Sequence, residues 1–192
     1  DRPPLREYSS VSSDSLNRLD HIANSLPKLL LTSRVRRTIE ALKKDDLSID
    51  ELLAIGSEKD LRFAMVQLSF VAHAYLWGGA APEATLLEAI AKPWVKVAKF
   101  LGRPPILSYA SYCLDNWFLL DEKESISLEN VGLITNFLGG IDEDWFVTVH
   151  VCIENAASDA VKAAETIAQC TVDSDEKEMR NLLKRIEHSF KK

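Results

Sequence analysis

Two tyrosines and a cysteine share one predicted helix face in the second half of the chain. Tyr109, Tyr112 and Cys113 are followed by Asn116, which gives the spacing i, i+3, i+4 and i+7. Large aromatic rings, a polarisable thiol and an amide on one stripe suit the wall of a pocket for a flat ligand. The alternative is that these residues are simply core, with each hydroxyl bonded to a carbonyl group. Spacing alone favours the core interpretation.

A second predicted helix face contains a histidine in unusual surroundings. His150 lies within Phe-Val-Thr-Val-His-Val-Cys-Ile, a run that is otherwise apolar apart from one threonine, and shares its face with Phe146 and Glu154. An imidazole there is either a hydrogen-bonded core residue or a proton-handling group in a dry pocket. Position alone favours the core. Glu154, one turn further, could orient the imidazole or could face a basic group of another helix.

Other motifs that indicate chemistry are missing from the sequence. It contains no glycine-rich phosphate loop, no Cys-x-x-Cys or His-x-x-x-His pair and no Gly-x-Ser-x-Gly turn. Its four histidines lie far apart, so we expect no zinc or di-iron site from this chain alone. By motif alone the case for an enzyme is weak.

Composition excludes several classes of partner. The 192 residues have a formal net charge of −6, so we expect neither nucleic acid nor an anionic membrane surface as a partner. No run of about 18 apolar residues predicts a membrane span. The three cysteines are an odd number without close spacing, which favours a reducing compartment, and we expect the cytoplasm.

Apolar periodicity predicts an all-α protein with long buried helices and no convincing strand. Only 7 glycines and 7 prolines are present, too few turn residues for a sandwich or barrel. Pro27 should interrupt or bend the first helix, and Ser48 with Glu51 should form a capping box. After an irregular lead-in over 1–14, the expected helices cover 15–26, 35–43, 48–53, 58–76, 86–101, 104–120, 129–137, 145–170 and about 173–192.

Four stretches, taken together and in order, resemble the indoleamine 2,3-dioxygenase family. Residues 103–110, RPPILSYA, resemble the family's LPPxLxYA, and residues 114–117, LDNW, resemble its LANW. Upstream, residues 74–78, AYLWG, resemble AYVWG. Downstream, residues 146–157 resemble a helix with aromatic residues at its start and VEIAAA further along.

The resemblance implies a haem b enzyme that inserts dioxygen across the indole C2–C3 bond of tryptophan or a related indoleamine. The product is then of the N-formylkynurenine type, as in tryptophan catabolism through the kynurenine pathway. The resemblance implies a small helical domain over 1–103 and the start of the haem-pocket domain, its distal side, over 104–192. The expected partners are L-tryptophan, dioxygen and the remaining half of the same protein.

On this resemblance Tyr109, Tyr112 and Cys113 line the distal substrate pocket, and Phe146 packs on the indole beside Val147. Three of these residues depart from the family pattern. Tyr112 stands where the family commonly has Cys, Cys113 where it has a small aliphatic residue, and Val147 where it has an aromatic residue. The smaller Val147 leaves a roomier pocket.

His150 is the catalytic residue that the resemblance implies. Animal enzymes of the family have Ser at this position, whereas the related tryptophan 2,3-dioxygenases place a distal His in the equivalent part of the pocket. A buried, neutral imidazole could accept the indole N–H or donate to bound dioxygen.

The resemblance implies no iron ligand in this chain. The family's proximal His belongs to its second half, and neither His21, His73 nor His188 corresponds to it. Two alternatives remain: a haem enzyme of the same fold that rearranges a substituted indole in secondary metabolism, and a helical interaction module that has lost haem.

Overall fold

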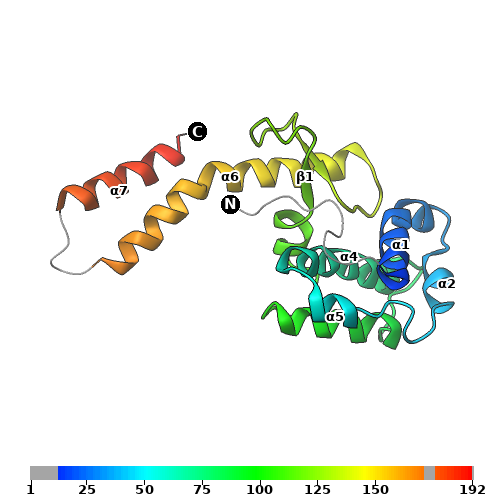
Figure 1. Ribbon diagram of the computed structural model, residues 1–192. Helices are drawn as coiled ribbons and strands as arrows, with labels where there is room; N and C mark the ends of the chain where they lie inside the picture. Colours follow the sequence, from blue (N-terminus) through cyan, green and yellow to red (C-terminus); the bar gives the residue numbers. More distant parts are fainter. Residues whose placement is uncertain (1–12, 171–175, 192) are drawn as a thin grey trace.

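The computed structural model describes residues 13–170 and 176–191, and confirms the all-α class. Its α-helices are α1 (Asp14–Leu31), α2 (Val35–Glu40), α3 (Asp50–Ile55), α4 (Glu58–Trp77), α5 (Glu88–Phe100), α6 (Ile141–Gln169) and α7 (Glu176–Ser189). A single π-helical turn, η1 (Ala110–Leu114), and two short strands, β1 (Trp117–Leu119) and β2 (Val131–Leu133), lie between α5 and α6 (Figure 1).

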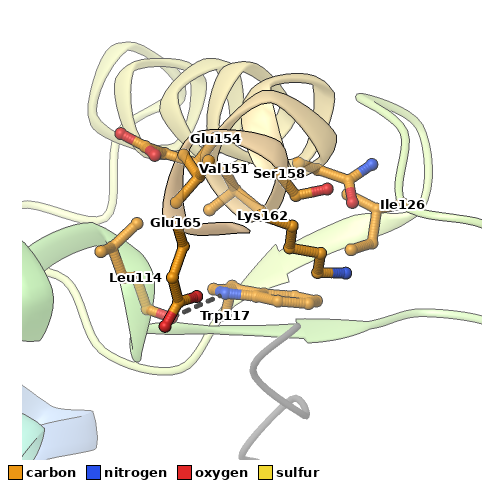
Figure 2. A pocket seen from close by; sticks show the side chains of 10 residues that line it. Leu114, Trp117, Ile126, Val151, Glu154, Ser158, Lys162 and Glu165 are labelled. Atoms are coloured by element: carbon orange, nitrogen blue, oxygen red, sulfur yellow. Dashed lines mark hydrogen bonds between the residues drawn. The ribbon is translucent and has the colours of Figure 1, made fainter. Parts of the chain in front are cut away.

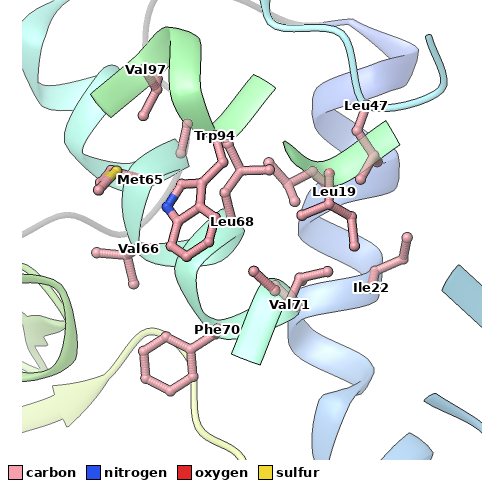
Figure 3. Close-up of a cluster of buried hydrophobic side chains, with 14 of the residues drawn as sticks. Leu19, Ile22, Leu47, Met65, Val66, Leu68, Phe70, Val71, Trp94 and Val97 are labelled. Carbon is pink, nitrogen blue, oxygen red and sulfur yellow. The ribbon is translucent and has the colours of Figure 1, made fainter. Parts of the chain in front are cut away.

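Helix α4 is the centre of the larger of two clusters of buried apolar residues. This cluster extends from Leu16 to Ala98, and we call it the first core. Its boundaries match the prediction to within one residue, because the side chain of Ser57 and that of Asp60 cap its N-terminus reciprocally. From Asp60 to Ala72 every residue is buried, and α1 and α5 pack against the helix (Figure 3). Trp94 on α5 donates its indole N–H to Ser69 Oγ at 3.1 Å, which pairs these two polar groups inside the core.

Two local predictions in the first half of the chain are wrong. Helix α1 is not interrupted at Pro27 but continues to Leu31, because the single backbone hydrogen bond lost at the proline is offset by burial of its apolar face, including Leu26, against α4. The capping box at Ser48 does not form: α3 begins at Asp50 with no side-chain cap, because the Ser48 amide is already bonded to Asp45 in the preceding turn. Gly56 ends α3 as predicted.

The two helices predicted over 104–120 and 129–137 are also wrong. The first segment contains η1 and then β1, and the second contains β2, which pairs antiparallel with β1. Asn116 explains the change, because its amide donates to the Thr135 carbonyl at 2.7 Å and accepts from the Thr135 N–H at 2.9 Å. These two bonds join the residue before β1 to the segment after β2, in place of the backbone hydrogen bonds that would continue a helix.

The buried apolar residues form two clusters. The first extends from Leu16 to Ala98, and the second contains Cys113, Trp117, Val131, Val147 and Val151. Tyr112 packs against both clusters. The predicted domain boundary after residue 103 falls between these clusters and remains a proposal.

Helix α6 is the longest element and extends beyond both clusters. Its first half lies beside η1 and β2, and α7 returns along its second half to form a helical hairpin (Figure 1). None of the helices in the described ranges combines the length and apolarity that crossing a membrane requires.

Candidate functional site

Four ring-bearing side chains converge where η1 meets the start of α6. We call these four residues the aromatic wall. Tyr112 lies in η1 and Tyr109 directly before it, and Phe146 and His150 lie on α6. The ring centroids lie 4.3 Å apart for Phe146 and His150, 5.9 Å for Tyr109 and His150, and 6.1 Å for Tyr112 and Phe146. Distances of this size are those of rings in contact.

The π-turn determines which side chains of its segment reach the wall. The amide of Asp115 donates to the Ala110 carbonyl at 2.8 Å, closing a turn one residue wider than an α-helical turn. The predicted stripe of Tyr109, Tyr112, Cys113 and Asn116 assumed α-helical spacing. With the wider turn, Cys113 and Asn116 are fully buried, whereas Tyr109 is 44% exposed.

Tyr112 connects the wall to the first core. Its ring stacks on Phe70 of α4 with centroids 5.5 Å apart and planes 11° from parallel. Burial, with a smaller contribution from the charge of Glu143, raises the pKa of the Tyr112 hydroxyl to about 12. The hydroxyl therefore stays protonated at neutral pH.

A hydrogen bond to a residue of α6 fixes the hydroxyl group of Tyr109. Its Oη donates to Glu154 Oε1 at 3.0 Å, and burial followed by this bond raises the pKa of Tyr109 to about 12. Glu154 thus takes neither of the two roles considered from the sequence: it holds Tyr109, whose ring in turn contacts His150 edge-on.

His150 is partly buried, so the expected full burial is not observed. Its Nδ1 lies 2.6 Å from the Phe146 carbonyl oxygen, which can only accept a hydrogen bond. Nδ1 is therefore the protonated nitrogen, and Nε2 of the neutral ring is an acceptor. Phe146, one turn earlier, is 50% exposed.

Two of the predicted pocket residues lie behind the wall. Cys113 and Val147 are both fully buried in the second cluster, together with Trp117 and Val151. Burial raises the pKa of the Cys113 thiol to about 11, which leaves it protonated and unreactive at neutral pH.

Glu143 is a residue whose role the sequence did not reveal. Its carboxylate accepts from the backbone amides of Phe137 and Leu138, each at 2.8 Å, and from Gly139 at 3.3 Å. As an acidic residue in the first turn of α6, it also suits the dipole of that helix. The bonds fix the loop before α6 and place Phe137 against Phe70 at 4.6 Å.

Comparisons with known proteins show the family of this chain. The model of the indoleamine 2,3-dioxygenase family matches residues 3–192. The chain belongs to the indoleamine 2,3-dioxygenase family. It is 37% identical to the indoleamine 2,3-dioxygenase of Saccharomyces cerevisiae over 82% of this chain and 35% of the yeast protein. It is 32% identical to rat indoleamine 2,3-dioxygenase 1 over 89% of this chain and 41% of the rat protein.

The chain spans less than half the length of the family members it matches. For human indoleamine 2,3-dioxygenase 2, which is 28% identical, the match includes 96% of this chain and 46% of the human protein. Within the described ranges no group of three or more His, Cys, Asp and Glu side chains could hold a metal ion.

A separate cleft of about 430 Å³ lies between α6 and the segment from η1 to β1 (Figure 2). Lys162 and Glu165 reach from α6 toward the Trp117 indole, whose N–H donates to the Leu114 carbonyl at 3.0 Å. None of the site residues predicted from the sequence lines this cleft. Glu154 borders both the cleft and the wall.

Proposed function

We propose that the complete protein is a haem-dependent dioxygenase that inserts dioxygen across the indole C2–C3 bond of L-tryptophan or a related indoleamine. The expected product is of the N-formylkynurenine type. The observation that supports this proposal is the aromatic wall with His150, in a chain of the indoleamine 2,3-dioxygenase family. We also propose the cytoplasm as its compartment, since Cys113, Cys152 and Cys170 are all free.

The wall fits one side of a haem pocket. Tyr109 and Phe146 are each about half exposed, so together they offer apolar surface to a flat ring. When bound, haem b supplies the iron centre at which dioxygen is activated. We propose that the axial histidine comes from the part of the family's length that this chain does not span.

His150 would be the catalytic residue of the wall. Its Nδ1 proton is engaged by the Phe146 carbonyl, so Nε2 is the atom that can accept the indole N–H of the substrate. This single bond would orient the indole edge. A substrate without the N–H would leave the Nε2 acceptor unpaired and bind less well.

The other predicted site residues would shape the pocket rather than move protons. Phe146 would pack on the indole face, and Tyr109 would close the side of the pocket next to His150. Tyr112 would present the edge of its ring between Phe146 and Phe137. Cys113 and Val147 would support these rings from behind.

A haem enzyme that rearranges a substituted indole is the second candidate. The observation that favours it is the bulk of Tyr112, which stacks deep against Phe70 at a position where the family commonly has Cys. A larger ring there changes the volume offered to the substrate.

Optical spectroscopy of the full-length protein tests the proposal. We expect a Soret band that shifts on addition of L-tryptophan, followed by formation of a formylkynurenine-type product under a ferrous, aerobic assay. No Soret band would contradict both haem functions and favour the haem-free interaction module. A Soret band without product, across several reductants, would favour the rearranging enzyme.

A matched pair of variants connects the spectrum to the wall. Phe146→Ala should abolish most of the shift induced by L-tryptophan, because the indole loses its packing partner. Phe100→Ala removes a similarly exposed phenylalanine at the end of α5 and should leave the shift unchanged. Equal behaviour of the two variants would contradict the assignment of the wall as the substrate site.

A further inference from the structure

A buried carboxylate lies between two arginines directly behind the aromatic wall. Asp115 is 4% exposed, and its Oδ2 lies 2.7 Å from Arg103 in the segment before η1. Its Oδ1 lies 3.7 Å from Arg62 of α4, which is itself 9% exposed. We call these three residues the Asp115 cluster. It connects α4, the α5–η1 segment and the end of the π-turn.

The position of Asp115 relates the cluster to the wall. Asp115 directly follows η1, and Tyr109 directly precedes it. The Asp115 amide closes the π-turn on the Ala110 carbonyl, and the Tyr112 amide donates to the Ser108 carbonyl at 2.9 Å. Because one turn separates Tyr109 from Asp115, fixing the aspartate also fixes the direction in which Tyr109 and Tyr112 leave the turn.

Two of the three charges in the cluster, those of Asp115 and Arg62, are buried, and the third, Arg103, is partly buried. Charged groups are rarely buried unless paired, and removing one partner leaves an uncompensated charge. Arg62 is the only basic residue on the buried side of α4, and its Nε has no hydrogen-bond partner among the described residues. That Nε lies 3.8 Å from the exposed carboxylate of Glu58, so Arg62 lies between two acidic residues, of which only Asp115 is buried.

We propose that Asp115 is a positioning residue, which through Arg62 and Arg103 holds the π-turn so that Tyr109 and Tyr112 complete the substrate wall. The inference rests on the proposed function for its substrate. Asp115 does not touch the substrate in this account. It acts through the 3.0 Å bond of Tyr109 to Glu154 and the stacking of Tyr112 on Phe70, both of which need the turn in this orientation.

Steady-state kinetics of the full-length protein tests the role with two substitutions. Asp115→Ala should raise the KM for L-tryptophan by about fivefold or more while kcat changes by less than about twofold, because substrate placement and not chemistry is affected. Asp115→Asn keeps the shape and one hydrogen bond and should lie between wild type and Asp115→Ala. Glu88→Gln, which alters an exposed ion pair with Lys92 of α5, is the control and should change neither constant.

Hydrogen exchange gives a measurement that does not depend on turnover. The amides of Tyr112 and Asp115 should exchange about tenfold faster in Asp115→Ala than in wild type, since the turn opens more often. Amides in the middle of α4 should exchange at unchanged rates. If wild type shows no turnover, the proposed function fails, and the exchange rates still decide whether Asp115 fixes the turn.

A double variant separates positioning from general destabilisation. Asp115→Ala leaves Arg62 with only its 3.8 Å ion pair to the exposed carboxylate of Glu58, whereas Asp115→Ala with Arg62→Met removes that poorly compensated charge. Positioning predicts that the double variant regains stability but keeps the raised KM and fast exchange. Recovery of KM and exchange together with stability would overturn the proposal, as would unchanged KM and exchange in Asp115→Ala.

Discussion

The first core and the aromatic wall use the same kinds of side chain differently. In the first core Phe70 is fully buried, and Trp94 is almost fully buried with its indole N–H bonded to Ser69. In the wall Phe146 is half exposed, and the imidazole of His150 is bonded to a backbone carbonyl through Nδ1. Apolar surface left open beside polar groups is typical of binding sites. The comparison separates residues that stabilise the fold from residues available to a ligand.

The largest effect on stability should come from substitution of Phe70, the residue of the first core that stacks on Tyr112 of the aromatic wall. Phe70→Ala removes a fully buried ring that stacks on both Tyr112 and Phe137, so we expect a loss of about 3–5 kcal/mol in the free energy of unfolding. Urea denaturation measures it. Phe100→Ala, the exposed control, should cost about 0.5 kcal/mol or less. Similar costs for both would contradict the division between core and surface.

Asn116→Ala should have the next largest effect, because the Thr135 N–H and carbonyl group lose their side-chain partner in a buried place. We expect a loss of about 2 kcal/mol in unfolding free energy. The matched control is Asn136→Ala, whose amide makes one exposed bond to Asp144 and should be nearly neutral. A neutral result for Asn116→Ala would mean that the hairpin does not depend on this residue.

The smallest expected effect is on stability at alkaline pH, where Tyr109 and Tyr112 of the aromatic wall ionise. Their pKa is raised to about 12 in the folded chain, whereas an unfolded tyrosine ionises near about 10. A raised pKa gives stability that is complete below about pH 10 and is lost as the pH rises through about 12. The urea midpoint should therefore fall over this range, and fall less in Tyr109→Phe/Tyr112→Phe. Equal pH dependence in both proteins would contradict the raised pKa of these two hydroxyls.

Much of the first region could be predicted from sequence because its interactions are local. The boundaries of α4 follow from an apolar run that begins after Asp60, and Gly56 ends α3 as expected. The hairpin of β1 and β2 could not be predicted, since it depends on Asn116 bonding to Thr135, which lies far along the chain. Side-chain bonds between distant residues leave no periodic pattern.

The candidate site was predictable where its helix is regular. Phe146 and His150 share a face of α6 at i and i+4, as the spacing indicated, and their rings are in contact. The η1 residues were less predictable because a π-turn changes the period, which turns Cys113 inward and leaves Tyr109 outward. The Asp115 cluster depends on Arg62, whose charge in an apolar helix was the available signal.

The most direct test of the wall as a catalytic site compares two histidines in the full-length protein. His150 and His73 each bond through Nδ1 to the carbonyl four residues earlier and each contact an aromatic ring, but His73 belongs to the first core. We predict that His150→Ala lowers turnover of L-tryptophan by about a hundredfold while haem content changes by less than about twofold. His73→Ala should change turnover only in proportion to haem content. A parallel loss of turnover and haem in His150→Ala would contradict the account and make His150 a structural residue.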